Sequence, residues 1–198
     1  MRARMALAYA NIKVEHREIL LKKKPQSMLQ YSPKGTVPVL VVGDSVIDES
    51  LAIMHWALEH NDRDNWLLND DRVLQKEMRE LITLNDEKFK PQLDHYKYSD
   101  RHELSEESYR NQSEWFLELL NNKLSKQYYL IGKKITMADI AIFPVIRQYA
   151  FVNKTWFDQT AYCHLQKWLE NHIQSSLFQS IMHKHSLWVD YQKYIKEH

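Results

Sequence analysis

The chain has 198 residues, 44% of them hydrophobic, and its 27 Lys and Arg against 26 Asp and Glu give a formal net charge of +1. This length suffices for one or two buried cores. The balanced charge argues against nucleic acid or an anionic membrane as partner, and no apolar run approaches the ~20 residues of a membrane helix. A single cysteine excludes an internal disulfide and a cysteine-based zinc site, which fits the reducing cytoplasm. Three glycines are too few for a glycine-rich phosphate loop. We therefore expect a small molecule or another protein as partner.

The beginning of the chain alternates between helical and extended patterns. Residues 2–10 are strong helix formers with an apolar stripe at helical spacing. Residues 14–20 mix β-branched and charged side chains, which predicts a strand at the edge of a sheet. Pro25 can then open a short helix that ends near Tyr31.

The next segment has the pattern of a β-hairpin followed by a helix. Residues 37–42 are largely apolar and β-branched, and Gly43-Asp44 is a two-residue turn from which Val46-Ile47 returns. Residues 51–59 have helical periodicity. The resulting order of helices and strands is that of an α/β unit without an opening strand. A helix that connects two parallel strands needs a strand before it, and no strand precedes the helix over residues 2–10. A different small fold that begins with a helix is the alternative.

The remainder of the chain has the pattern of helices only. Residues 61–69 are polar and predict a linker, and a helix begins at Asp70, which Pro91 would kink or end. Further helices are expected over residues 104–126, 136–149, 161–172 and 177–183. No histidine spacing indicates a metal site. We therefore expect an α/β domain over residues 1–60, a linker over 61–69 and an all-helical domain over 70–198.

The most informative stretch contains Pro38 near the beginning of a predicted strand. Proline cannot donate a hydrogen bond within a sheet, so this position suits either an edge strand or a cis Val37–Pro38 peptide. The cis form would turn the Val37 N–H and C=O outward, where they could pair with an extended peptide. The sequence leaves both interpretations open.

Glu49 and Ser50 lie where the hairpin leads into a predicted helix. The N-terminus of a helix presents free N–H groups and a positive dipole, which suit a carboxylate. The Ser50 hydroxyl can add a donor and the Glu49 carboxylate can hold an ammonium group, although Ser50 can also serve as a plain helix cap. A free main-chain edge beside such a socket predicts a receptor for a γ-glutamyl peptide.

These segments resemble the glutathione-binding signature of the cytosolic glutathione transferases, which is carried here by Thr36–Leu40, the hairpin and Asp48–Ile53. Ile135–Ala141 is similar to the motif that begins a helix in the second domain of that family. In physical terms Thr136 and Asp139 form a capping box with Asp in place of Glu, and we expect its role to be folding stability. The resemblance covers nearly the whole chain.

The resemblance implies a thioredoxin-like N-terminal domain that lacks its first strand, an all-α helical-bundle C-terminal domain, and glutathione as a substrate without a metal. It places the main chain of Val37 on the cysteinyl part of glutathione, with Pro38 in the cis form. Glu49 and Ser50 would hold the γ-glutamyl group. Lys34 would lie near the glycine carboxylate, unless it is a solvated loop lysine. The resemblance also implies a homodimer.

The catalytic Ser, Tyr or Cys of this family lies between its first strand and its first helix. Residues 1–8 resemble the interior of that helix in a bacterial, omega-like branch, whose Cys-Pro-Tyr or Cys-Pro-Phe sequence stands just upstream. We therefore expect the chain to begin after this point and assign no catalytic residue within it. Cys163 is expected to be buried and inert, and the adjacent His164 to point elsewhere on the same helix.

The expected activity is glutathione-dependent transfer or thiol–disulfide exchange on an electrophilic or disulfide substrate. A non-catalytic glutathione-binding or regulatory protein on the same fold is the alternative, which the absent catalytic residue favours and the retained Glu49-Ser50 pair disfavours. A pocket for the second substrate is expected between the domains. Its aromatic candidates, which core packing explains as well, are His95, Tyr96, Tyr98 and Trp115.

Overall fold

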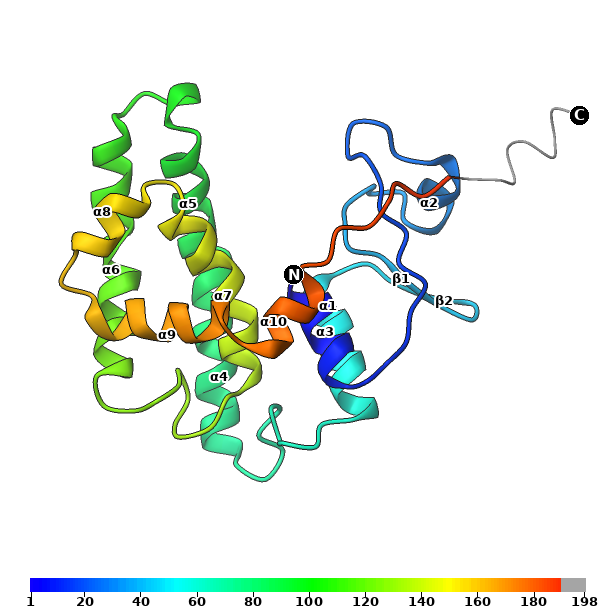
Figure 1. Ribbon diagram of the computed structural model, residues 1–198, viewed down its shortest axis with the longest axis horizontal. Coiled ribbons are helices and arrows are strands. Elements are labelled where there is room, and N and C mark those ends of the chain that lie inside the picture. The colour runs from blue at the N-terminus through cyan, green and yellow to red at the C-terminus, as the bar shows by residue number, and fades with distance from the viewer. Residues whose placement is uncertain (190–198) are drawn as a thin grey trace, which may run out of the picture. The chain divides into compact units, whose positions relative to one another are not determined.

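The computed structural model describes residues 1–189, which form two units. The first unit comprises Met1–Asn61 and the described residues from Gln179 onward, and the second comprises Asp62–Phe178 (Figure 1). The division after Asn61 falls at the start of the predicted linker. The segment from Gln179 belongs to the first unit, whereas the sequence alone grouped it with the helical domain.

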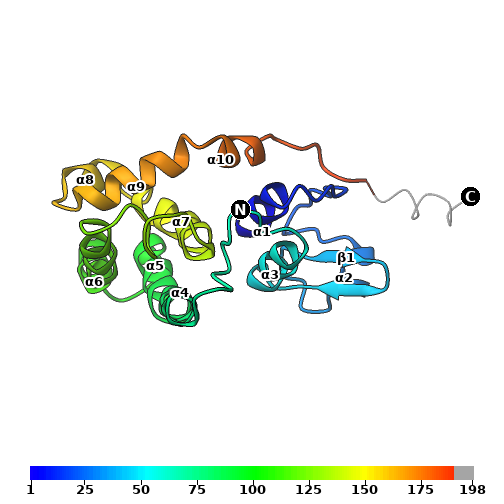
Figure 2. The ribbon, with the colours of Figure 1, turned by 90° about the horizontal axis from the view of Figure 1, so that it is seen from below.

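The first unit pairs a short sheet with helices that carry an apolar stripe. Its elements in chain order are α1 (Arg2–Tyr9), α2 (Gln26–Tyr31), β1 (Leu40–Val42), β2 (Ser45–Ile47) and α3 (Ser50–His60). Strands β1 and β2 are antiparallel, with Val41 opposite Val46, and Gly43 makes the turn with a φ of 57°. Helices α1 and α3 pack against each other (Figure 2), because each presents an apolar stripe. The buried residues of that contact are Met5, Ala6, Ile53, Met54, Ala57 and Leu58.

The predicted strand over residues 14–20 is wrong. The segment makes only isolated bridges, in which Glu18 pairs with Leu187 in parallel and Leu20 pairs with Lys23. Val14 and Leu20 are exposed, so the segment has no apolar face to bury against a sheet. The second predicted strand is shorter than expected, since pairing in β1 begins only at Leu40.

The second unit is a set of helices. Its elements are α4 (Arg72–Leu84), the π-helical turn η1 (Asn85–Phe89), α5 (Lys90–Lys97), the 3₁₀ turn η2 (Ser99–Arg101), α6 (Glu106–Leu124), α7 (Met137–Ala150), α8 (Lys154–Gln159) and α9 (Cys163–Ile173), and α10 (Ser176–Ile181) follows. The helices predicted near residues 104–126, 136–149, 161–172 and 177–183 are therefore present. Helix α8 was not predicted, and Asn153 caps it by accepting a hydrogen bond from the N–H of Trp156 at 3.0 Å.

The helix that the sequence begins at Asp70 is interrupted before Pro91. It changes at Asn85 into the π turn, whose closing bond runs from the N–H of Lys90 to the C=O of Asn85. Pro91 then lies in the first turn of α5. Proline is tolerated at that position, because the first turn of a helix needs few of its own N–H groups.

Helix α7 is the centre of the second unit, and the predicted capping box begins it. The buried Asp139 carboxylate accepts hydrogen bonds from the N–H and the hydroxyl of Thr136, at 2.9 and 3.0 Å. It also accepts from the N–H of Leu130 at 3.0 Å and from the indole of Trp168 at 2.9 Å. Burial raises the pKa of Asp139, and these hydrogen bonds act in the opposite direction. The box is therefore a structural anchor, as predicted.

Among residues 1–189, none of the helices combines the length and the apolar character that a transmembrane span requires.

Candidate functional site

The peptide bond between Val37 and Pro38 is cis, which is one of the two forms that the residues left open and the form that the family resemblance implies. Val37 is 48% exposed and precedes β1. Within the described chain its N–H and C=O take part neither in the β1–β2 ladder nor in another main-chain hydrogen bond. This residue therefore offers an open donor and an open acceptor to an extended peptide.

The start of α3 lies at the same end of the hairpin as Val37. Leu40 pairs with Ile47, so the residues before β1 run beside those after β2. Glu49 stands at the N-cap position and makes no side-chain cap, and Ser50 is the first helical residue. Among the described residues no side chain caps the first N–H groups of this helix, and the Glu49 carboxylate beside them is exposed while Ser50 is half-buried. This arrangement suits an α-amino acid group, with its carboxylate on the helix and its ammonium on Glu49.

Lys34 contacts the acidic residues of this site. Its Nζ lies 3.7 Å from Oδ2 of Asp48 and 3.7 Å from Oε1 of Glu49. The side chains of Lys34 and Glu49 are 64% and 68% exposed, so solvent weakens the pair. The sequence analysis placed Lys34 on a glycine carboxylate and did not predict its contact with Asp48. The only sequence signal for this contact was the opposite charge of Lys34 and Asp48, which lie in two different loops.

Gly35 shapes the loop that leads from α2 to Val37, and sequence reasoning gave it no role. Its N–H donates to the C=O of Ser32 at 2.9 Å, and its φ is 62°. A Cβ at this position would lie 3.2 Å from Cδ2 of Leu29. The left-handed conformation favours glycine, and a Cβ would also require the Leu29 side chain to shift. Gly35 therefore helps to set the path of the chain toward the open peptide.

Cys163 is exposed, so the expectation that it is buried is wrong. It is the first residue of α9, and the buried face of that helix is formed by Leu165, Trp168 and Leu169. The helix start is held by Asn121, whose Oδ1 accepts from the N–H of His164 at 3.0 Å and of Leu165 at 3.1 Å. Cys163 lies in the second unit, whereas the residues predicted to bind glutathione lie in the first.

The aromatic candidates for a second-substrate pocket make contacts within the second unit. Tyr96 is buried, with its ring 4.9 Å from that of Tyr149, and desolvation raises the pKa of Tyr96 to about 12. The Trp115 indole donates to Gln92 at 2.8 Å. His95 packs against His102. The ring of Tyr98 contacts the charged groups of Lys97 and Arg101. Core packing therefore explains Tyr96, whereas His95 is exposed and Tyr98 and Trp115 are half-buried.

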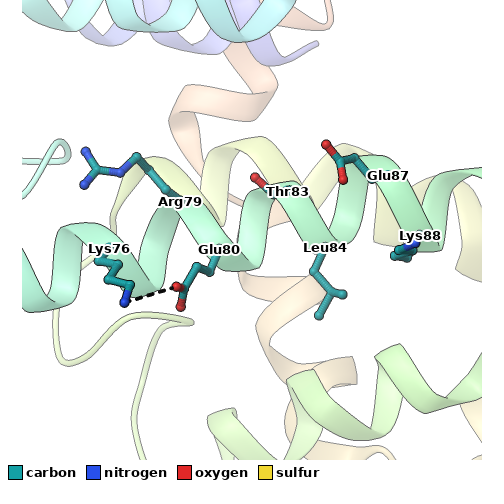
Figure 3. A pocket seen from close by; sticks show the side chains of 7 residues that line it. All are labelled: Lys76, Arg79, Glu80, Thr83, Leu84, Glu87 and Lys88. Carbon is teal, nitrogen blue, oxygen red and sulfur yellow. Dashed lines mark ion pairs between the residues drawn. The ribbon is translucent and has the colours of Figure 1, made fainter.

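A surface hollow of about 390 Å³ lies along α4 and η1. Figure 3 shows the side chains that line it: Lys76, Arg79, Glu80, Thr83, Leu84, Glu87 and Lys88. Lys76 and Glu80 form an ion pair at 3.7 Å across one helical turn. The residues predicted to bind glutathione do not line this hollow, and its mixed charges favour no single ligand class.

Known protein families match the N-terminal and C-terminal parts of the chain. Residues 1–66 match the family model described as "Glutathione S-transferase, N-terminal domain", and residues 85–175 match "Glutathione S-transferase, C-terminal domain". A "Probable maleylacetoacetate isomerase" of Caenorhabditis elegans is 32% identical over 154 residues, which span 73% of this chain and 71% of that protein.

Solved structures share the fold. A Tau class glutathione S-transferase from mango, Mangifera indica, has a TM-score of 0.79 at 25% identity, covering 92% of this chain and 87% of that one. Glutathione S-transferase-I, solved with the ligand lactoylglutathione, has a TM-score of 0.74 at 21% identity, covering 90% of each chain. The chain belongs to the glutathione S-transferase family. Its fold is accordingly a thioredoxin-like N-terminal domain followed by a helical C-terminal domain.

Proposed function

We propose that the first unit binds glutathione and that the protein performs glutathione-dependent transfer or thiol–disulfide exchange on an electrophilic or disulfide substrate. The observation that supports this most is the open main chain of Val37 at the same end of the hairpin as the uncapped start of α3. Membership of the glutathione S-transferase family supports it independently.

In the proposed complex, separate groups of the first unit bind the three residues of glutathione. The γ-glutamyl carboxylate accepts from the first N–H groups of α3 and from the Ser50 hydroxyl, and its ammonium lies on Glu49. The cysteinyl main chain pairs with the N–H and C=O of Val37, beside the cis Pro38. Lys34 leaves Glu49 when the ammonium arrives and approaches the glycine carboxylate.

The chemistry belongs to the glutathione sulfur. In exchange, its thiolate attacks one sulfur of a disulfide substrate, a new S–S bond forms, and the old one breaks to release a thiolate that takes up a proton. In transfer, the thiolate forms a C–S bond with an electrophilic carbon, and the carbon–halogen bond of an aryl halide breaks to release a halide ion. The proposal assigns no catalytic residue within residues 1–189.

A second candidate is isomerisation of a substrate like maleylacetoacetate, which the 32% identity to the nematode protein favours. A non-catalytic glutathione-binding or regulatory protein remains the alternative from a different class. We further propose a cytoplasmic homodimer with the thioredoxin-like domain over residues 1–60, the linker over 61–69 and the helical domain over 70–198. Size-exclusion chromatography with light scattering tests the dimer.

Calorimetric titration of the full chain with reduced glutathione tests the proposed site. Glu49→Gln and Ser50→Ala should each weaken binding, Glu49→Gln by roughly tenfold or more, because a hydrogen bond to a charged group contributes about 1.5–3 kcal/mol. Glu59→Gln, which removes the same charge from the exposed last turn of α3, is the matched control and should bind like the unaltered chain.

Turnover assays then separate the candidates. Hydroxyethyl disulfide tests exchange, a reactive aryl halide tests transfer, and maleylacetoacetate tests isomerisation. Binding without turnover of any of these supports the regulatory alternative. Absence of glutathione binding, or equal affinity in the Glu49→Gln and Glu59→Gln variants, would refute the proposed site.

A further inference from the structure

The segment formed by residues 183–189, here called the C-terminal strap, runs beside the residues that follow α1. The N–H of Trp188 donates to the C=O of Glu18 at 2.8 Å, and Leu187 pairs with Glu18 in parallel. The guanidinium of Arg17 lies 4.8 Å from the centre of the Trp188 ring. The strap thus adds a main-chain hydrogen bond and a cation–π contact to a segment that no β-ladder of the described chain includes.

Arg4 of α1 holds the strap from the other side. Its Nη2 lies 3.5 Å from the C=O of His183 and 3.3 Å from Nε2 of His185. Arginine has only donors, so Nε2 of His185 must accept, which requires a neutral imidazole with its proton on Nδ1. The contact between Arg4 and His185 in the docked strap therefore requires one protonation state of His185.

The surroundings of His185 are rich in positive or protonatable groups. Its ring stacks on that of His16 with 4.0 Å between centres, and His183 lies edge-on at 5.2 Å. Glu18 is the acidic group nearby, and its Oε2 is already 2.9 Å from Nε2 of His16.

The N-terminal amine of Met1 is a further titratable group beside Arg4, and its burial, followed by the charges of Arg4 and Arg2, lowers its pKa from 8.0. Arg17 pairs with Glu15 at 2.9 Å, and Lys184 on the strap is exposed. A proton on His185 would direct an N–H at the Arg4 guanidinium and add a positive charge beside two other imidazoles.

We propose that the C-terminal strap is a pH-sensitive latch, which is docked on the first unit while His185 is neutral and is released when His185 takes up a proton. Docking joins α1, the Glu18 segment and the strap, so release exposes the C=O of Glu18 and frees the Arg4 guanidinium. This device is independent of the glutathione site proposed above.

The direction of the pH response follows from the docked geometry. Desolvation, followed by the positive fields of His16, Arg4 and His183, lowers the pKa of His185 from 6.5, and Glu18 opposes this. The released strap therefore binds more protons than the docked one below about pH 6.5, and docking weakens as the pH falls. Because one proton is involved, the docking constant falls by at most about tenfold per pH unit.

Hydrogen–deuterium exchange of the Trp188 amide in the full chain tests the latch. Rates are measured from pH 8 to pH 5 and corrected for the intrinsic effect of pH on exchange. We expect protection at pH 8 that declines below about pH 6.5 by at most tenfold per unit. The amide of Ile53, which donates to the C=O of Glu49 inside α3, should keep its protection throughout.

His185→Gln is the decisive variant, because glutamine retains an acceptor for Arg4 and cannot be protonated. Its Trp188 amide should be protected at every pH tested. Three results would overturn the latch: no Trp188 protection at pH 8, protection that does not change on acidification of the unaltered chain, or a His185→Gln variant that responds to acid as the unaltered chain does. Loss of protection at every pH in this variant would also count against it, since the acceptor is still present.

Discussion

The ammonium of Lys34 lies 3.7 Å from the carboxylate of Glu49, where the proposed function places the ammonium of the γ-glutamyl group. Both side chains are largely exposed, so the pair is weak enough for a ligand to replace. Under the proposed function Lys34 would have two partners in succession: Asp48 and Glu49 in the free protein, and the glycine carboxylate in the complex.

Replacing Lys34 with Met separates these two roles. Affinity for glutathione should fall by about two- to fivefold, the amount expected for an exposed ion pair. Affinity for γ-glutamylcysteine, which lacks the glycine carboxylate, should not fall. Calorimetric titration with both ligands measures this, with Lys22→Met as the exposed control. An equal loss for the two ligands would contradict the assignment to glycine.

Replacing Gly35 with Ala should destabilise the protein. The positive φ costs an alanine about 1–2 kcal/mol, and the contact 3.2 Å from Leu29 adds to it. Gly43→Ala is the matched control, because Gly43 also has a positive φ of 57° but has nothing within 4 Å of its Cβ position. Urea unfolding should show the larger loss for Gly35→Ala, and the reverse order would argue against the crowding.

His172 predicts an acid-sensitive second unit. It is buried against Phe143 and Trp168, and desolvation lowers its pKa from 6.5 to about 4. The unfolded chain binds this proton first, so the free energy of unfolding is unaffected above about pH 6.5 and falls as the pH drops toward 4. The full loss from this group is on the order of 3 kcal/mol.

Urea unfolding of His172→Leu at pH 7.5 and pH 4.5 measures this contribution. The variant should lose less stability on acidification than the unaltered chain. His164→Gln, on the exposed face of the same helix, should keep the original pH dependence. If His172→Leu and the unaltered chain show the same loss, His172 is not the acid-sensitive group.

The exposed Cys163 should react with a thiol reagent such as Ellman's reagent in the folded protein, with one thiol per chain. Because it lies outside the proposed glutathione site, Cys163→Ser should leave glutathione affinity unchanged within twofold. Labelling before and after denaturation gives the accessible fraction. A thiol that reacts only after denaturation would show that the side chain is covered.

Much of the fold was predictable because local signals were strong. The turn residue Gly43 predicted the hairpin, Pro38 suggested the cis peptide, and Thr136 with Asp139 predicted the start of α7. These features depend on residues that are close in the chain, whose geometry the sequence restricts directly.

The wrong predictions concern positions whose state depends on distant residues. Whether residues 14–20 form a strand depends on a sheet to pair with, and Glu18 and Leu20 make isolated bridges with Leu187 and Lys23 instead of joining a ladder. Cys163 is exposed because the face of α9 that packs on the rest of the unit is formed by Leu165, Trp168 and Leu169, which only the tertiary fold decides. For the candidate site, residue types suggested Val37, Glu49 and Ser50, but the contact between Lys34 and Asp48 required the folded loop.

The Asp139 carboxylate joins three stretches of the second unit that are separate in the chain: Leu130, the start of α7 at Thr136, and Trp168 on α9. During synthesis on the ribosome, this set of hydrogen bonds cannot be complete until Trp168 has emerged. Before Trp168 has emerged, the Asp139 carboxylate can accept hydrogen bonds only from Leu130 and Thr136. The helical domain should therefore acquire its final protection against protease late in translation and as a single event, since no shorter nascent chain contains every donor that this buried anion needs.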